Sequence, residues 1–374
     1  MVFLNRRNFF TALLASAMGA MLLLKSADLG DGIRKGLYIC SYSVIPALFP
    51  FMALSVFICK SAAADFFAAA LRPITRLLKI PAACGGALLA AVIGGYPAAA
   101  KCISDLAAEG ILERKTAAKM LCYCVNAGPP FLISAVGIAV FGSIKIGFLL
   151  FAAQFLSSAV IALAISAFSE KAPKDPLAFS PVLRKNNAAC LIESIISAAE
   201  SCFRMCAFIV IACGALELVF EGAAFSKVSA DPAARAVFTG FFEVTAGALA
   251  CGEIEGFSAV IIAGALSSFS GISVMLQVAA VTDESKIPLA PFVISRFFHA
   301  GITAGLLRLF LAFSGDSVAA FSAKGGSIEA VLSASAPAAV SLLCMASLFL
   351  LSVVPPKSEK EPFFKRLRQA VPKK

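Results

Sequence analysis

Residues 94–101 read GGYPAAAK and lie inside sequence that is otherwise apolar enough to be buried in a bilayer. Glycine tolerates almost any backbone angle, and proline lacks the amide hydrogen that a helix needs. The stretch therefore predicts a break, within a re-entrant hairpin over residues 82–100. Unpaired backbone groups cost several kcal/mol each in lipid, so such a break persists only where protein or a watery cavity meets it.

A second break is predicted at residues 126–130, which read NAGPP and again combine glycine with proline. The two breaks are separated by a short polar helix whose charged side chains cannot lie in hydrocarbon. We interpret the two breaks as one half of a solute site.

The second half of the chain contains a counterpart. Residues 263–277 read AGALSSFSGISVMLQ, so an apolar run becomes rich in glycine and serine and ends in a polar residue. Interrupted hydrophobic segments at corresponding places in two halves are typical of the binding sites of transporters. The halves match by pattern, with few identical residues, and the pattern predicts two pseudo-repeated halves related as an inverted repeat.

The composition of the chain defines its class. Of the 374 residues, 60% are apolar and 14% are charged, and the mean hydropathy of +0.91 is far from the balance of soluble proteins. The sequence lacks the alternation of membrane strands, so we predict an all-α polytopic membrane protein. The net charge of +10 gathers at the expected membrane edges, which favours contact with the lipid bilayer and argues against a nucleic-acid partner.

Proline and charge divide the chain into parts. Residues 170–187 contain three prolines and four basic residues and are predicted to be a linker between two halves of similar length. From residue 357 onward there are seven basic residues against two acidic ones, which places this tail in the cytoplasm. We expect roughly 8 to 10 membrane segments in total. The expected parts are an N-terminal transmembrane helix and loop, a first half, the linker, a second half and a basic tail, at residues 1–36, 37–169, 170–187, 188–354 and 355–374.

The apolar run over residues 9–24 resembles a secretory signal peptide. It ends in KSAD at residues 25–28, which offers no clear small-x-small cleavage site, and the rest of the chain stays hydrophobic. We therefore favour a first transmembrane helix whose N-terminus lies in the cytoplasm.

The sequence offers little for catalysis or for binding a metal or cofactor. Its 12 cysteines lie mostly in apolar runs without the paired C-x-x-C spacing of a zinc site, and it has 1 histidine. Because an intramembrane enzyme needs a nucleophile with a base or a metal cluster, we expect no enzyme, no metal and no cofactor. The sequence also lacks a Walker-type nucleotide motif, which leaves a proton- or ion-coupled transporter or a passive facilitator.

Three polar residues in apolar sequence are candidates for a site. Glu243 lies close to Thr245 and Gly247, and an ionisable group at membrane depth is a functional candidate by default. The amides of Asn126 and Gln277 either hydrogen-bond a solute or satisfy the backbone of the breaks.

Three cationic or titratable residues have two interpretations each. Lys101 follows the first break, and Arg296 and His299 are neighbours at i and i+3 on a predicted helix. They could supply positive charge for an anion, and His299 and Glu243 could couple transport to protons. The alternatives are an interfacial lysine that reaches toward water and, for the other two, a satisfied buried pair or a cytoplasmic anchor.

The order of these motifs resembles the YlbJ family of sporulation integral membrane proteins. That family belongs to the nucleoside-recognition, or Gate, group of membrane domains, which are akin to concentrative nucleoside transporters. The resemblance covers residues 37–352. The landmarks that carry it are GGYP at 94–97 with Lys101, NAGP at 126–129, Glu243-x-Thr245-x-Gly247, and SGISV at 270–274 with Gln277.

The resemblance implies a role in endospore formation. The implied activity is movement of a small anion such as dipicolinate, by alternating access, across the mother-cell-derived membrane around the forespore. The sequence departs from the family pattern in two places: a second proline stands at Pro130, and Ser270 takes a position at which we expect glycine. The candidate substrate-binding residues are Gly95, Tyr96, Pro97, Lys101, Asn126, Gly128, Glu243, Thr245, Ser270, Gly271, Ser273 and Gln277, and the candidate coupling residues are Glu243, His299 and Arg296.

A different class of function stays open. A non-transporting structural or assembly protein, needed for the spore cortex or envelope, is the alternative, since resemblance in fold does not establish transport. A homo-oligomer is an open expectation in either case.

Overall fold

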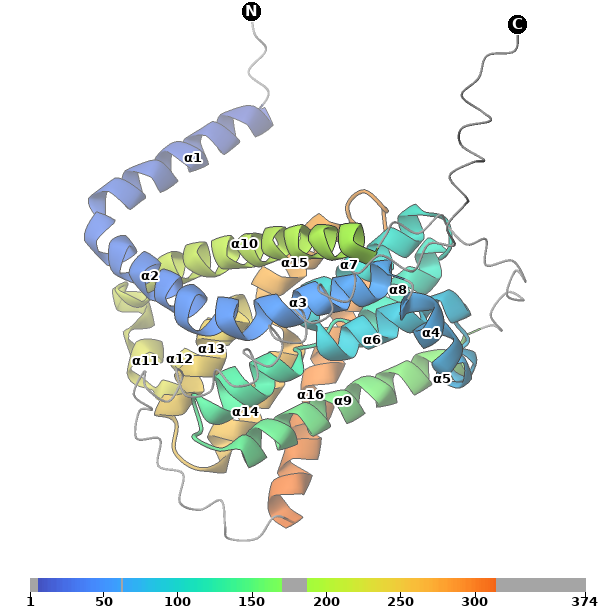
Figure 1. Cartoon of the computed structure of the whole chain (residues 1–374). Helices are drawn as coiled ribbons and strands as arrows, with labels where there is room; N and C mark the ends of the chain where they lie inside the picture. The colour runs from blue at the N-terminus through green and yellow to red at the C-terminus, as the bar shows by residue number, and fades with distance from the viewer. Residues whose placement is uncertain (1–5, 62, 170–186, 314–374) are drawn as a thin grey trace, which may run out of the picture.

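The computed structural model describes residues 6–61, 63–169 and 187–313, and every element in these ranges is a helix (Figure 1). The elements of the first part are α1 (Arg6–Leu24), α2 (Ser26–Ile39), η1 (Cys40–Val44), α3 (Ile45–Lys60), α4 (Ala63–Ala70), α5 (Arg72–Leu77), η2 (Ala82–Cys84), α6 (Gly85–Ile93), α7 (Gly95–Ala108), α8 (Arg114–Cys124), η3 (Pro130–Ile138) and α9 (Ile144–Ala167). Those of the second part are α10 (Asn187–Phe220), η4 (Ala223–Phe225), α11 (Ser226–Ala230), α12 (Pro232–Phe242), α13 (Val244–Ala250), η5 (Cys251–Glu253), α14 (Phe257–Phe269), α15 (Gly271–Thr282) and α16 (Ala290–Phe313). The predicted linker up to residue 186, the second half beyond residue 313 and the basic tail lie outside the described residues.

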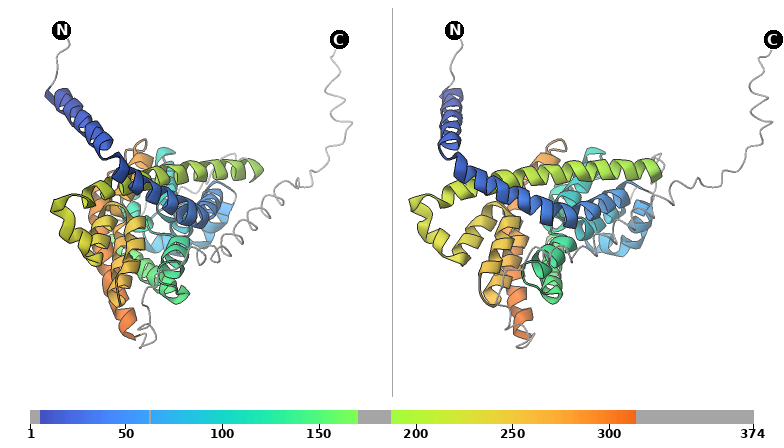
Figure 2. Two further views of the ribbon diagram at one scale, coloured as in Figure 1. Left: turned by 90° about the vertical axis from the view of Figure 1, so that its left-hand side faces the viewer. Right: turned by 60° about the vertical axis from the view of Figure 1, so that its left-hand side comes forward.

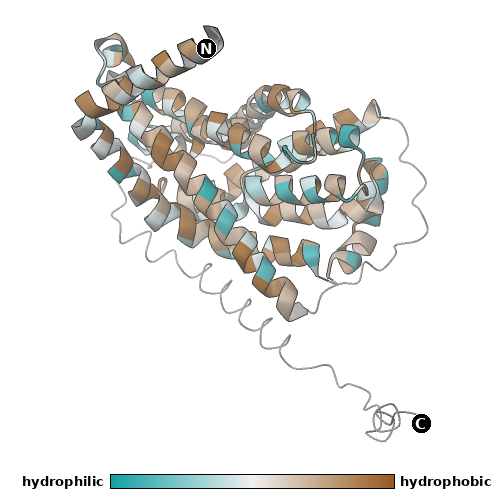
Figure 3. Cartoon of the chain, turned by 90° about the horizontal axis from the view of Figure 1, so that it is seen from above, coloured by the Kyte–Doolittle hydropathy of each residue, from teal (hydrophilic) through white to brown (hydrophobic). Residues whose placement is uncertain are grey.

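Five helical segments of the described part are long and apolar enough to cross a membrane. They are Ser26–Lys60, Ile144–Ala167, Ala188–Phe220, Phe257–Thr282 and Ala290–Phe313. Many large apolar side chains on these helices are exposed, as expected of a surface that meets lipid. Hydrophobic residues, coloured brown, recur along the helices of the body (Figure 3). The predicted all-α membrane fold is confirmed, whereas the roughly 8 to 10 membrane segments are not.

The helix α1 forms over the predicted apolar run but stands apart from the helical body (Figure 2). It is not among the five long apolar segments of the described part. The chain turns at Lys25 and enters α2, η1 and α3, which together make one continuous helical segment.

The segment α2–η1–α3 continues through two prolines. Pro46 is the second residue of α3 and Pro50 lies further inside it, so each removes an amide hydrogen from a continuous helical segment. The turn before Pro46 is the π-helix η1, and such wider turns occur inside α-helices where the regular hydrogen-bond pattern is disturbed. The prolines therefore change the local winding of this helix without ending it.

The long helix α10 packs along α2 and α3 (Figure 1). Glycines on α2 allow a close approach. A Cβ on Gly32 would lie 2.6 Å from the carbonyl oxygen of Cys213, and one on Gly36 would lie 2.8 Å from the Cα of Val210. Small residues at helix contacts are typical of packing in membranes, where backbones approach closely.

The first predicted break separates α6 from α7. The helix α6 ends at Ile93, and α7 begins at Gly95, whose φ of +74° lies in the left-handed region that favours glycine. The two short helices contact each other across the break. The sequence GGYP thus interrupts a helix where the sequence predicts it.

A second pair of short helices, α12 and α13, is separated by Glu243, which has an extended backbone. These helices contact each other at Gly247, where a Cβ would lie 2.2 Å from the Cα of Gly240. Position 247 therefore has no room for a side chain, whereas a Cβ on Gly240 would meet the Leu266 side chain at 2.5 Å.

Two further helices are interrupted. The chain leaves helical geometry between the end of α8 at Cys124 and the start of η3 at Pro130. The helix α14 ends at Phe269, and α15 begins at Gly271 after a single left-handed residue, Ser270. The breaks predicted within residues 126–130 and 263–277 are both present.

Candidate functional site

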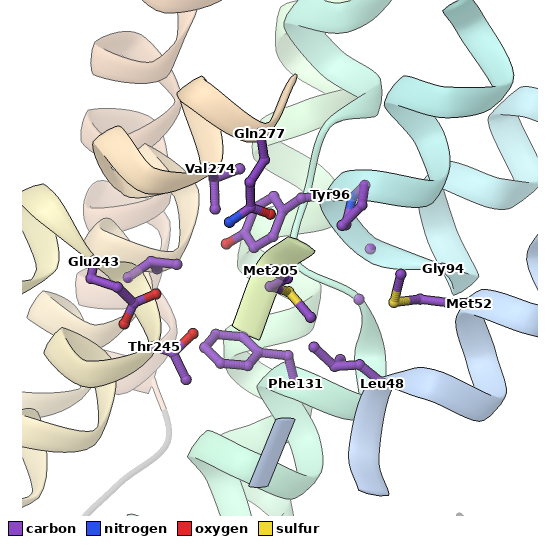
Figure 4. A pocket seen from close by; sticks show the side chains of 14 residues that line it. Leu48, Met52, Gly94, Tyr96, Phe131, Met205, Glu243, Thr245, Val274 and Gln277 are labelled. Carbon is purple, nitrogen blue, oxygen red and sulfur yellow. The ribbon is translucent and has the colours of Figure 1, made fainter. Parts of the chain in front are cut away.

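A narrow cleft lies where these breaks meet inside the helical body (Figure 4). Its walls come from α3, the break before α7, α7, the segment before η3 and η3 on one side, and from α10, the break before α13, α13 and α15 on the other. Its free space holds little more than one water molecule. The residues that line it are Leu48, Met52, Gly94, Gly95, Tyr96, Pro97, Gly128, Phe131, Met205, Glu243, Val244, Thr245, Val274 and Gln277.

The two breaks of the first half touch each other at the cleft. A Cβ on Gly95 would lie 3.3 Å from the backbone nitrogen of Gly128, and a Cβ on Gly128 would lie 3.2 Å from the nitrogen of Gly95. Glycine at both positions lets the two backbones come together. The positive end of α7, a helix of 14 residues, consequently faces the cleft.

Glu243 is buried in the break between α12 and α13, with 1% of its surface exposed. Its carboxyl group accepts the backbone N–H of Ala246 at 2.5 Å and caps the start of α13. The carboxyl is therefore held by its own helix terminus and faces the cleft beside Thr245 (Figure 4).

Tyr96 and Gln277 approach the cleft from α7 and α15. The Tyr96 hydroxyl donates a hydrogen bond to the carbonyl of Ser267, near the end of α14. Gln277 extends beside the Tyr96 ring (Figure 4). These two side chains place polar groups from both halves at the same cleft.

Arg296 lies outside the cleft and is completely buried on α16, with 0% of its surface exposed. Its guanidinium donates to the carbonyl of Cys122 and, at 2.7 Å, to that of Val125, and it lies 3.5 Å from the carbonyl of Ser268. These carbonyls belong to the C-terminal ends of α8 and α14, where a cation is favourable and where the breaks leave acceptors without helical partners. Arg296 thus joins two interrupted helices.

His299 and Lys101 also lie away from the cleft. The His299 Nε2 atom is 3.2 Å from the carbonyl oxygen of Gln154 on α9. The Lys101 ammonium group lies 2.8 Å from the Asp105 carboxylate, one turn further along α7. The side chains of Arg296, His299 and Lys101, which the sequence suggests as positive charges for an anion, therefore do not line the cleft.

The remaining predicted residues divide between the cleft and its supports. Asn126 donates to the carbonyl of Tyr123 at 2.7 Å and to the hydroxyl of Ser158 at 2.9 Å, so its amide satisfies the broken backbone. The predicted residues that line the cleft are Gly95, Tyr96, Pro97, Gly128, Glu243, Thr245 and Gln277. The predicted residues that do not are Lys101, Asn126, Ser270, Gly271, Ser273, Arg296 and His299.

The apolar residues that line the cleft could not be predicted from the sequence. Leu48, Met52, Phe131 and Met205 have no distinguishing motif, because they are ordinary residues of apolar helices. Their position depends on how α3, η3 and α10 pack. Pro50, two residues after Leu48 in the same helix, is the nearest sequence signal.

Ser270 has a φ of +78°, which is unfavourable for residues other than glycine. We predict that Ser270→Gly raises the free energy of unfolding by about 1 kcal/mol, because it relieves this backbone strain. Thermal unfolding in detergent measures the change. As a matched control, Ser273→Gly in the interior of α15 should lower stability by about 0.5 kcal/mol. A loss of stability in Ser270→Gly would contradict the left-handed geometry.

Among the described residues, no group of three or more His, Cys, Asp or Glu side chains is placed to hold a metal ion. Nine of the eleven described cysteines are buried, as small apolar side chains usually are.

Comparison with known proteins gives one informative similarity. No protein-family model and no solved structure matches the chain. The chain is 24% identical over 314 residues to the sporulation integral membrane protein YlbJ of Bacillus subtilis strain 168, a match that covers 75% of this chain and 77% of that protein. Together with the apolar helices, this similarity supports an integral membrane protein of the same kind.

Proposed function

We propose that this chain, a member of the YlbJ family of sporulation integral membrane proteins, moves a small anionic solute such as dipicolinate across a membrane that surrounds the forespore. The observation that carries the proposal is the cleft at which interrupted helices of both halves meet. Interrupted helices persist in a membrane where protein covers their polar backbone or where they line a path for a solute, and the breaks at Gly95, Gly128 and Glu243 line the cleft.

The order of the elements supports two pseudo-repeated halves. In the first half a long helix, α3, is followed by the pair α6 and α7, the interrupted helix α8 and η3, and the straight helix α9. In the second half α10 is followed by α12 and α13, by α14 and α15, and by α16. A repeat of this kind is the basis of alternating access, in which one half moves against the other around a shared site.

The polar groups of the cleft favour the binding of an anion. The start of α7 at Gly95 and Tyr96 presents the positive end of a helix dipole, which favours a carboxylate. The Thr245 hydroxyl and the Gln277 amide can donate further hydrogen bonds.

A solute larger than water needs the cleft to open. Its apolar walls include Leu48 and Met52 from the first half and Met205 from the second. Methionine side chains adapt easily to a changing contact. We propose that these side chains separate when the halves move, and that the structure represents an occluded state of the transport cycle.

Uptake by vesicles tests the proposal. Vesicles containing the purified full chain should accumulate radiolabelled dipicolinate above protein-free vesicles, and unlabelled nucleosides should compete poorly. Uptake of nucleosides without uptake of dipicolinate would mean that the transported solute is a nucleoside and not an anion. Entry of neither solute, with the protein folded in the vesicle, would overturn transport.

The rival function is a non-transporting assembly protein of the spore envelope, and the narrowness of the cleft is the observation that favours it. A transporter and an assembly protein should respond differently to a substitution in the cleft. Thr245→Val should reduce uptake while the protein still inserts and localises, if it is a transporter. A sporulation phenotype unaffected by Thr245→Val, in cells that need this protein, would favour the assembly role. We propose no enzymatic activity in either case.

A further inference from the structure

The cleft contains a carboxyl group but no cationic side chain. Among the residues that line it, the titratable ones are Glu243 and Tyr96. The Tyr96 hydroxyl already donates to Ser267, and Lys101 is paired with Asp105. A carboxylate that entered this space would meet an acidic group in a region almost closed to water.

No cationic side chain lines the cleft beside Glu243 in the described part of the chain. The titratable groups that interact with Glu243 electrostatically are the Tyr96 hydroxyl from α7, the Cys40 thiol from η1 and the Cys213 thiol from α10. Two cations act on these neighbours, Arg296 on Tyr96 and Lys35 on Cys213, but neither lines the cleft. From its own hairpin Glu243 receives the hydrogen bond of the Ala246 N–H, and α15 presents the uncharged Gln277.

Two carboxylates cannot both stay ionised at close range in such a place. The repulsion between like charges and the cost of desolvation are both relieved when one proton is shared between them. The cation that offsets the charge of a bound anion is then a proton rather than a side chain.

We propose that the bound solute carboxylate and Glu243 share one proton, so that the solute binds only when this proton is present. The inference rests on the proposed function, since it concerns how the same cleft recognises its anion. The proton sits between a solute oxygen and a Glu243 oxygen, no covalent bond forms or breaks elsewhere, and the proton is released when the solute leaves. Glu243 is thus a hydrogen-bond donor to the solute rather than a fixed negative charge.

The affinity for the solute should fall as the pH rises. Because the bound state holds a proton that the empty ionised site lacks, affinity is full at low pH and falls about tenfold for each unit of pH above the pKa of Glu243 in the empty protein. Glu243→Gln keeps the shape of the side chain and carries a permanent N–H donor. Its carbonyl oxygen can still accept the Ala246 N–H that caps α13.

The experiment compares binding of radiolabelled dipicolinate to the wild type and to Glu243→Gln, in detergent, from about pH 6 to about pH 9. The expected result is an affinity that falls with pH in the wild type and stays constant in Glu243→Gln, which keeps the affinity of the wild type at low pH within about tenfold. Glu243→Leu, which lacks a donor, should not bind at any pH. The protonation of dipicolinate itself changes with pH in the same way for all three proteins, so its effect cancels in the ratio of their affinities.

Three results would overturn the inference: a wild type whose affinity does not change with pH, a Glu243→Gln variant with the same pH dependence as the wild type, or a folded Glu243→Gln variant that does not bind at low pH. Failure of the wild type to bind at any pH would instead contradict the proposed function. Thermal unfolding of each variant shows whether it is folded.

Discussion

Arg296→Met should lower the free energy of unfolding by about 3–5 kcal/mol, because it leaves buried carbonyl groups at the ends of two interrupted helices without a donor. The guanidinium bonds the carbonyls of Cys122 and Val125 at the end of α8 and lies near that of Ser268 in α14. Unfolding can be followed by a thiol-reactive dye, since heating exposes the nine buried cysteines of the described part.

The matched control is Arg204→Met on α10. Arg204 is paired with Glu200 at 2.6 Å, but the two side chains are 51% and 61% exposed. Such pairs contribute about 0–1 kcal/mol, so this variant should unfold close to the temperature of the wild type. Equal effects of the two substitutions would mean that Arg296 does not join the interrupted helices.

Gly247→Ala should be the most damaging small change in the α12–α13 pair. The added Cβ would lie 2.2 Å from the Cα of Gly240 and 2.4 Å from its nitrogen, so one backbone has to move. We expect a loss of about 2–3 kcal/mol of stability and a loss of solute uptake, because α13 carries the helix start that Glu243 caps. Thermal unfolding and vesicle uptake measure the two effects.

Gly305→Ala is the control for the general effect of replacing a glycine by alanine in a helix. Gly305 is exposed on α16, and a Cβ added there would meet nothing within 4 Å, so alanine should stabilise the helix by about 0.5–1 kcal/mol. If Gly247→Ala were as well tolerated as Gly305→Ala, the two helices could not be packed as described.

The interruptions of the helices could be predicted from the sequence because glycine and proline act locally. Residues 94–97 interrupt the helix at Gly95, whose φ is +74°. Ser270, which follows the end of α14 at Phe269, has the left-handed backbone of a position at which the family resemblance predicts glycine. Glu243 could be singled out because a carboxyl group in apolar sequence is costly without a partner.

The assignment of the cationic residues could not be predicted, because it depends on contacts between distant segments. The sequence shows Arg296 beside His299 on a helix, which leaves open an anion site, a satisfied buried pair or a cytoplasmic anchor. The acceptors of Arg296 instead include a carbonyl that is 171 residues away in the chain, at Val125. Whether a polar side chain serves a solute or the broken backbone is decided by tertiary packing, as it is for Asn126, whose amide also donates to Ser158 on α9.

The most direct test of the transport cleft compares two changes on the same helix, α15. Gln277 lines the cleft, whereas Ser273, one turn earlier, is buried outside it. Dipicolinate uptake by vesicles should fall at least about tenfold in Gln277→Leu and stay at the level of the wild type in Ser273→Ala. Normal uptake by Gln277→Leu, or an equal loss in both folded variants, would contradict a solute path through this cleft.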